Sequence, residues 1–341
     1  MNMSHGMLDR RQALKAGVLG AAGVWVAGNN MGCATGAPKS QHASRTIVAS
    51  DAEPLVALRV AHLSDIHVQP ELLANRGLGV CLKHVMALER RPGLVVTGGD
   101  MIMDSFGQEA ARTKLLWEMF NGIVKDECGV PIMYTLGNHD IWGWNKGRSK
   151  TSGIEPSWGK KWALDVLGLS TPYHSVDRNG WHIVVLDSTH PDPDNSDGYI
   201  AKLDEAQMSW LESDLSRVDP KTPVAVVSHI PIMTITHLVE PKQVKGNDYF
   251  IEGGIMHIDA AKLHRLFAKS GNVKLCLSGH IHRRDRIEMD GVTYICDGAV
   301  SGSWWKGRGD RCDEGYGVVD LMADGSFKHE YMTFGWKAAT A

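Results

Sequence analysis

The 341-residue chain has few cysteines, and none of them are clustered. Its six cysteines show no C-x-x-C spacing, which excludes a thiolate zinc knot and argues against a disulfide framework. Only a pairing of Cys128 with Cys312, in two loop-like segments, stays open. Cys81, Cys276 and Cys296 fall within predicted helices or strands, where we expect them to be small buried apolar residues.

Other absences exclude or argue against further classes of protein. The formal net charge is only −3, so the chain lacks the basic surface that an extended nucleic acid requires. No heptad pattern or internal repeat is present, which argues against coiled coils and solenoids. The mildly apolar stretch Ala16–Ala27 is too short for a transmembrane helix. With 43% apolar residues, the chain can form one large globular core.

The sequence does contain five short polar strings, each directly after an apolar run. The strings are Asp65-Ile66-His67, Gly99-Asp100, Gly137-Asn138-His139-Asp140, Ser228-His229 and Gly279-His280-Ile281-His282. The preceding runs are LRVAHLS, PGLVVTG, PIMYTL, PVAVVS and VKLCLS, which are short and apolar as buried strands are. Each string therefore follows the C-terminal end of a strand, where open α/β sheets bind ligands. We expect the strings to meet in one crevice.

The residue types in these strings indicate a site for two metal ions. The candidate ligands are Asp65, His67, Asp100, Asn138, His229, His280 and His282. Two ions about 3.5–4 Å apart need an anionic bridge, for which Asp100 is the natural candidate. Asp65 and His67 are two residues apart, so at the end of an extended segment they should point the same way, as should His280 and His282. A nitrogen and oxygen ligand set without thiolate suits two divalent or mixed-valence ions of Fe, Mn or Zn.

The strings and their order resemble those of the calcineurin-like metallophosphoesterases, whose pattern is D-x-H, G-D, G-N-H-[DE], H and G-H-x-H. The resemblance runs from about Leu58 to about Asp320. It implies that one metal is held by Asp65, His67, Asp100 and His282, and the other by Asp100, Asn138, His229 and His280. It also implies a four-layer αββα sandwich, whereas patterning alone indicates only an α/β fold with an antiparallel portion.

The same resemblance implies a metal-dependent phosphoric ester hydrolase that uses a metal-bridging hydroxide. Asp100 and His139 are then the catalytic residues, with His139 a non-ligand that assists the leaving group. Resemblance to the cyclic-nucleotide phosphodiesterase-like branch favours small diester substrates and rests on Leu186-Asp187-Ser188, Gln207 and Trp210-Leu211. Met103 stands where purple acid phosphatases have a tyrosinate ligand, which argues against that branch.

Two alternatives to the diesterase stay open. One is a phosphomonoesterase acting on nucleotides or lipid head groups. The other is a catalytically silent, exported metal-binding protein. His139 counts against the silent protein, because the metals do not need this residue as a ligand. The sequence leaves the natural substrate, the native metal pair and the oligomeric state open.

Loops around the crevice should set substrate specificity. The candidate substrate contacts are Trp142, Trp144, Trp304, Trp305, Lys306 and Arg308. Indole faces beside cationic side chains could stack a base or a lipid glycerol while holding phosphate. The alternative is that these tryptophans fill gaps between loops.

The N-terminal region is a different kind of sequence. Residues 1–33 resemble a twin-arginine signal peptide, with Arg10 and Arg11 before a Gly- and Ala-rich stretch; a basic amphipathic helix is the alternative. Gly32-Cys33 resembles a degraded lipoprotein cleavage site. We therefore predict export to the periplasm or another extracytoplasmic space, with any membrane attachment only through a lipid on Cys33. Residues 34–54 would be a flexible spacer, and residues 55–341 the single enzyme domain.

Overall fold

The computed structural model describes residues 54–195, 197–239 and 243–338. The predicted signal peptide, including Arg10, Arg11 and Cys33, lies outside the described residues, as does nearly all of the predicted spacer. Among the helices of the described ranges, none combines the length and the apolar character that crossing a membrane requires.

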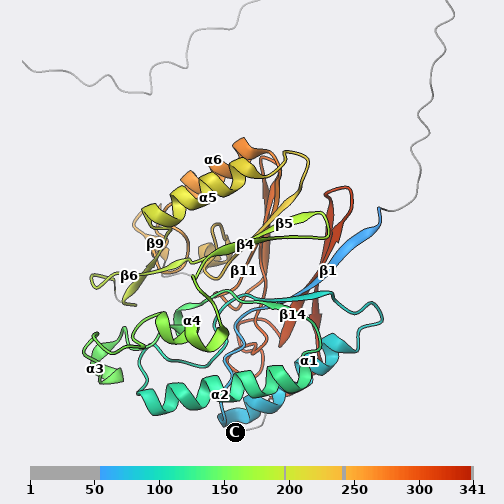
Figure 1. The fold of residues 1–341 in the computed structure, drawn as a ribbon. Coiled ribbons are helices and arrows are strands. Elements are labelled where there is room, and N and C mark those ends of the chain that lie inside the picture. The colour runs from blue at the N-terminus through green and yellow to red at the C-terminus, as the bar shows by residue number, and fades with distance from the viewer. Residues whose placement is uncertain (1–53, 196, 240–242, 339–341) are drawn as a thin grey trace, which may run out of the picture. The chain divides into compact units, whose positions relative to one another are not determined.

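Two sheets face each other at the centre of the described domain (Figure 1). The first has the order β15-β14-β1-β2-β3 and the second the order β12-β13-β11-β8-β5-β4. The strands of the first are β1 Val56–Leu63, β2 Leu94–Thr97, β3 Ile132–Met133, β14 Gly315–Met322 and β15 Phe327–Thr333. The strands of the second are β4 His174–Arg178, β5 Trp181–Leu186, β8 Val224–Ser228, β11 Val273–Ser278, β12 Asp285–Met289 and β13 Val292–Cys296.

Helices cover the outer face of each sheet (Figure 1). The layer on the first sheet contains α1 Ala74–Met86, α2 Ala110–Glu127 and the short α4 Lys161–Leu167. The layer on the second contains α5 Glu205–Arg217 and α6 Ala260–Ser270. The remaining strands form two small ribbons, β6 Thr189–Pro191 with β7 Tyr199–Ala201 and β9 Val244–Lys245 with β10 Asp248–Tyr249. The remaining helices are the short α3 Lys146–Ser149 and the 3₁₀ helices η1 Glu71–Leu73, η2 Asn138–Asp140 and η3 Thr236–Val239. This arrangement confirms the four-layer αββα sandwich.

The continuous apolar runs of the sequence follow from burial of both faces of each sheet. In β1, Leu58 and Val60 pack into the core between the sheets, whereas Ala61 and Leu63 pack against the helices. Successive side chains of a strand point to opposite faces, so a strand with two buried faces needs apolar residues throughout. The strand ends are thereby held inside the sandwich, which fixes the polar strings that follow them.

Two local details concern the turn between β12 and β13 and the loop cysteines. The turn between β12 and β13 joins Met289 to Val292 through Asp290 and Gly291, whose φ values of 49° and 80° suit a two-residue hairpin. The open pairing of Cys128 with Cys312 is wrong, since both are free thiols. The Cys312 sulfur instead accepts the backbone N–H of Ala299 at 3.1 Å.

A buried carboxylate links the two sheets. Asp297, directly after β13, accepts hydrogen bonds from His62 of β1 and His329 of β15, both at 2.7 Å. Burial opposes ionisation, but the two imidazoles outweigh it and lower the pKa of Asp297 from 3.8 to about 2. A lowered folded-state pKa stabilises the protein above about pH 4, and this contribution is lost as the pH falls towards 2.

We therefore expect Asp297→Asn to destabilise the protein by roughly 2 kcal/mol at pH 7, and by less at pH 3. Urea unfolding of the wild type and the variant at both pH values measures this difference. The exposed Asp126→Asn serves as the control and should show no such pH-dependent difference. An Asp297→Asn effect that is equal at pH 7 and pH 3 would contradict the assigned role of the carboxylate.

Candidate metal centre

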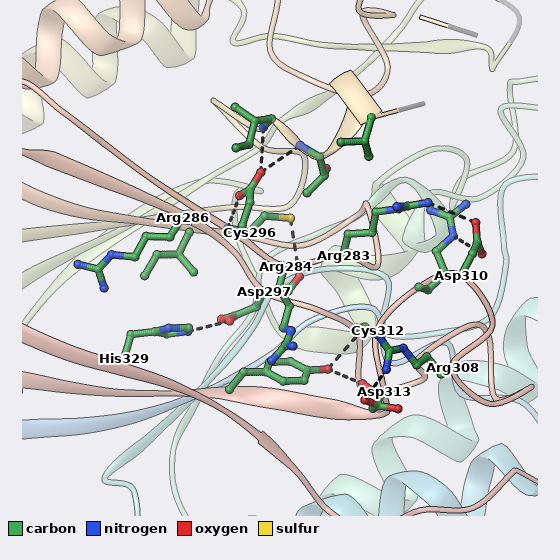
Figure 2. Close-up of a pocket in the computed structure, with 17 residues that line it drawn as sticks. Arg283, Arg284, Arg286, Cys296, Asp297, Arg308, Asp310, Cys312, Asp313 and His329 are labelled. Atoms are coloured by element: carbon green, nitrogen blue, oxygen red, sulfur yellow. Dashed lines mark hydrogen bonds and ion pairs between the residues drawn. The ribbon is translucent and has the colours of Figure 1, made fainter. Parts of the chain in front are cut away.

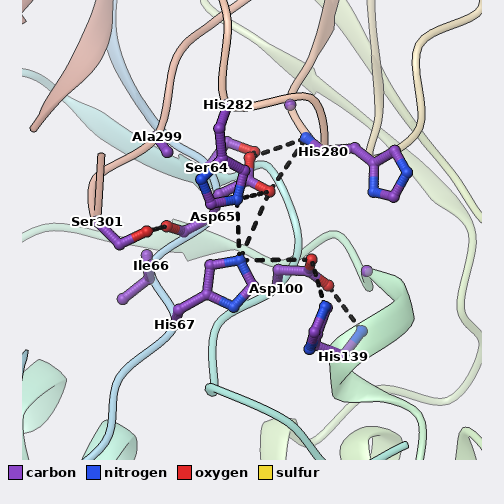
Figure 3. A network of polar contacts seen from close by, with 12 residues as sticks. Ser64, Asp65, Ile66, His67, Asp100, His139, His280, His282, Ala299 and Ser301 are labelled. Carbon is purple, nitrogen blue, oxygen red and sulfur yellow. Dashed lines mark hydrogen bonds and ion pairs between the residues drawn. The ribbon is translucent and has the colours of Figure 1, made fainter. Parts of the chain in front are cut away.

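The strand ends bring all seven predicted ligands into one cluster, most of which Figure 3 shows. Asp65 and His67 follow β1, Asp100 follows β2, and Asn138 lies in a 3₁₀ turn after β3. His229 follows β8, and the two histidines of the last string follow β11. Three groups of side chains have ligand atoms within 4.8 Å of one another: Asp65, His67 and His282; His67, Asp100 and His139; and Asp100, His229 and His280.

Asp65, His67 and His282 form one half of the centre. The Nε2 atoms of His67 and His282 lie 3.1 Å apart, and the His282 Nε2 lies 3.3 Å from Asp65 Oδ1. All three side chains are buried. Two imidazole nitrogens facing each other at this distance need a proton or a metal ion between them, and the carboxylate supplies the opposite charge. The geometry therefore fits a cation.

The other half is built around Asp100. Its Oδ2 lies 3.2 Å from His229 Nε2 and 3.7 Å from His67 Nε2. The His229 Nε2 also lies 3.1 Å from the side-chain oxygen of Asn138. One carboxylate oxygen thus faces ligand atoms of both halves, as a bridging ligand must.

Backbone carbonyls orient three of the imidazoles. His229 Nδ1 contacts the carbonyl oxygen of Gly98 at 2.7 Å, and His282 Nδ1 that of Gly302 at 2.5 Å. His280 Nε2 contacts the carbonyl of Gly254 at 3.0 Å. Since each of these nitrogens can only donate to a carbonyl, a neutral ring has its lone pair on the other nitrogen. The nitrogen available to a metal ion is thus Nε2 in His229 and His282, and Nδ1 in His280.

The electrostatics of the cluster also fit metal ions. Burial, together with neighbouring imidazoles, lowers the pKa of His67 and of His280 to about 3, which keeps both rings in the neutral form that binds metals. Burial opposes charge on His229, but Asp100 and Asp65 outweigh it and raise its pKa to about 9. The carboxylates thus attract a positive charge, which a bound metal would supply while displacing the proton.

The backbone of the strings differs from the extended geometry expected from the sequence. The φ values of Asp65, His67, Asp100, His280 and His282 lie between 46° and 70°, in the left-handed region that residues with a Cβ atom avoid. Such a conformation costs on the order of 1–3 kcal/mol per residue. Asp65 and His67 converge, but through left-handed turns rather than by strand alternation. His280 and His282 do not point the same way as expected, because they belong to different groups of ligands.

Neighbouring glycines permit these turns. A Cβ atom on Gly279 would lie 1.6 Å from Ser64 Oγ, and one on Gly137 would lie 2.2 Å from Asp100 Oδ1. Any side chain at either position would therefore push a ligand string out of place, which explains the glycine that precedes the ligands in these strings.

The sequence motif contains Asp140 but gives no reason for it, and the structure supplies one. Its buried carboxylate accepts the backbone N–H groups of Gly137 at 2.8 Å, Asp100 at 2.9 Å and Met101 at 2.9 Å. It therefore ties the second and third polar strings together. Burial and the charge of Asp100 raise the pKa of Asp140 to about 7.

His139 occupies a different position from the buried ligands. Its side chain is 29% exposed, with Nε2 4.0 Å from Asp100 Oδ2 and Nδ1 3.6 Å from Asp104 Oδ1. It lines a cavity of about 550 Å³ together with Asn138, Phe106 and Tyr199. The sequence reasoning missed Asp104; its only signal was its place four residues after Asp100.

Two of the predicted substrate contacts are wrong. Trp305 is fully buried, and its indole N–H donates to the carbonyl of Ile66 at 3.0 Å. A Cβ atom on Gly77 would lie 2.2 Å from the Trp305 ring, so the indole fills the space beneath the first string. Trp142 is also buried, packs edge-on against Trp162 at 4.7 Å between ring centroids, and donates to a backbone carbonyl. Both fill gaps between loops.

The other predicted contacts lie in three places. The Trp304 ring is 4.5 Å from that of His282, against the first half of the centre. Trp144 packs against Phe106 at 6.1 Å between ring centroids; Phe106, but not Trp144, lines the cavity of His139. Lys306 is exposed, and Arg308 lines a separate cavity.

Comparison with known proteins finds similarity to phosphoesterases. The family model "Calcineurin-like phosphoesterase" matches residues 58–284. A "Probable cyclic nucleotide phosphodiesterase" of Rhodococcus erythropolis is 23% identical over 243 residues, or 68% of this chain and 67% of that protein. A "3',5'-cyclic-nucleotide phosphodiesterase" of Nostoc is 24% identical over 129 residues, or 38% of this chain and 42% of that protein.

The fold also matches a solved structure. A dimetal phosphatase from Danio rerio superposes with a TM-score of 0.53 at 14% identity, covering 80% of this chain and 94% of that one.

Proposed function

The chain belongs to the calcineurin-like phosphoesterase family and is a metal-dependent phosphoric ester hydrolase, and from this premise we propose that it hydrolyses small organic phosphodiesters. The proposal rests chiefly on His139, which adjoins the metal centre but opens to a cavity. A silent metal-binding protein has no need for such a residue.

Asp104 equips His139 for proton transfer to the leaving oxygen. Burial opposes a charge on the imidazole, but Asp100 and Asp104 outweigh it and raise the pKa of His139 to about 9. With its Nδ1 towards the Asp104 carboxylate, the ring can present a proton from Nε2 to an oxygen that leaves the phosphorus. Bound metal ions would supply an activated water and would neutralise charge that builds on the phosphoryl oxygens.

The residues that line the cavity suit a substrate whose non-reacting part is an organic group. Two aromatic rings, Tyr199 and Phe106, line the cavity with their centroids 5.9 Å apart. Tyr199 also packs against His280 at 6.2 Å, and Phe106 against Trp144 at 6.1 Å. Such a wall suits a flat or apolar group better than a free phosphate. Arg148 also lines the cavity and supplies a positive charge.

A direct assay tests this proposal. Protein reconstituted with Mn²⁺, Fe²⁺ or Zn²⁺ should hydrolyse bis-p-nitrophenyl phosphate with a higher kcat/KM than p-nitrophenyl phosphate. Protein treated with a chelator is the control and should be inactive. Preference for the monoester would favour the phosphomonoesterase, and absence of turnover with every metal would favour a silent binding protein.

We also propose export by the twin-arginine route, on the basis of the sequence alone. The double variant Arg10→Lys with Arg11→Lys keeps the charge but removes the arginine pair. We expect it to leave unprocessed, active enzyme in the cytoplasm, detected by fractionation and immunoblotting. Normal export of this variant would rule out the route.

A further inference from the structure

Figure 2 shows a second cavity, of about 700 Å³. It shares no lining residue with the cavity at His139. It is formed by β12 and β13 of the second sheet, by β15 of the first sheet, and by the loops around residues 235–239 and 308–313. Its lining is rich in arginine: Arg283, Arg284, Arg286, Arg308 and Arg311. The same lining contains four aspartates, so the positive charge available to a ligand depends on which arginines they pair with.

The acidic residues of the lining do not cancel this charge evenly. Asp285 accepts the Thr234 hydroxyl at 2.6 Å and the backbone N–H of Ile235 at 2.9 Å, so it holds a loop in place. Asp297 lies between His62 and His329, at the junction of the two sheets. Both carboxylates are thus engaged by structural hydrogen bonds.

The other two carboxylates lie at one end of the cavity. Asp310 accepts from Arg283 at 3.2 Å, and Asp313 lies 3.9 Å from Arg308. In Figure 2 both pairs lie on the side of the 308–313 loop. Arg284 is therefore left without a carboxylate partner among the described residues.

Arg284 is held by an aromatic ring instead. The carbon of its guanidinium group lies 4.8 Å from the centroid of the Tyr331 ring. The Tyr331 hydroxyl donates to the backbone carbonyl of Asp313 at 2.7 Å, which fixes the ring. A guanidinium group stacked on a fixed ring keeps its N–H groups available along its edge, in the fork that matches two oxygens of a phosphate.

We propose that this cavity binds a phosphate-bearing anion at a site separate from the metal centre. The anion would contact Arg284, whereas Arg286 on β12 is ion-paired with Glu288 at 2.5 Å and is not part of the proposed contact. Free inorganic phosphate and the phosphate of an organic ester share the required chemistry.

The cavity is connected to the metal centre through the backbone. Arg283 directly follows the ligand His282, and the backbone N–H of Cys312 donates to the His282 carbonyl at 3.0 Å. Arg311 lies 5.4 Å from the Trp304 ring, which packs on His282. An anion bound here would thus contact the two segments that position His282.

Calorimetric titration of inorganic phosphate into the full-length protein tests the proposal, with metals bound and after chelation. Chelation removes phosphate binding at the metal centre, so the arginine site should account for the binding that persists. Arg284→Gln should weaken that binding about 10- to 100-fold. Arg284→Lys should bind phosphate with intermediate affinity, because it keeps the charge but loses the planar guanidinium group that matches two phosphate oxygens. The control Arg217→Gln, at an exposed arginine of α5, should match the wild type.

Two results would overturn the proposal: no phosphate binding after chelation, or equal affinity of Arg284→Gln and the wild type. Repeating the titration with glycerol 3-phosphate distinguishes the sources, since tighter binding than phosphate indicates an organic ester. Because binding is measured without turnover, failure of the phosphodiesterase assay would leave this test unaffected.

Discussion

Asp100→Asn is expected to remove both metal ions and nearly all activity. The Asp100 Oδ2 faces His229 at 3.2 Å and His67 at 3.7 Å, so its charge serves both halves of the centre. An amide keeps the shape but not the charge, and it leaves the buried imidazoles without their shared counterion. Loss of a residue that only hydrogen-bonds a metal ligand typically lowers metal affinity by roughly 10- to 100-fold. We expect a larger loss here, because Asp100 would itself be a ligand.

Elemental analysis of the purified variant measures this loss directly, alongside its kcat/KM. Asp126→Asn, at an exposed position of α2, is a control of the same chemistry and should retain the metals and the activity. Unchanged metal content in Asp100→Asn would show that Asp100 does not bridge the ions.

His139→Ala is expected to keep both metals and to lower kcat by about 10²–10⁴-fold, the usual contribution of a positioned proton donor. The effect should be largest for substrates with a poor leaving group, because they depend most on protonation of the leaving oxygen. An activated aryl ester, whose phenolate leaves unaided, should lose much less. Steady-state kinetics over a series of leaving groups, together with metal analysis, measures both expectations.

Two outcomes would contradict the role of His139. Equal losses for all leaving groups would mean that it binds the phosphoryl oxygens. Loss of an ion would mean that it is a ligand, a role that its position beside His67 and Asp100 also allows. Asp104→Asn provides a matched test, since it should reproduce part of the kinetic effect with no loss of metal.

The sequence predicts the fold and the location of the site because both depend on local patterns. Buried strands appear as apolar runs: VKLCLS coincides with β11, and PVAVVS contains β8. The polar strings stand out because they interrupt these runs. Their convergence follows from the common direction of β1, β2 and β3 in one sheet and of β8 and β11 in the other.

The residues that the sequence did not reveal act through contacts between distant segments. Trp305 reads like an exposed loop tryptophan, yet it fills the space above Gly77, some 230 positions earlier in the chain. Asp104 carries no motif of its own and becomes relevant only through its distance to His139. The left-handed turns at the ligands are also hidden, because the sequence does not show which of its many Asp and His residues adopt a conformation that glycine prefers.

Those left-handed ligands limit how the metal-free protein can be stabilised. Glycine at position 65, 67, 100, 280 or 282 would relieve about 1–3 kcal/mol of backbone strain at each site. It would also delete a side chain that is largely buried and hydrogen-bonded, which costs about as much or more. Heat resistance of this enzyme therefore has to come from substitutions away from these five positions.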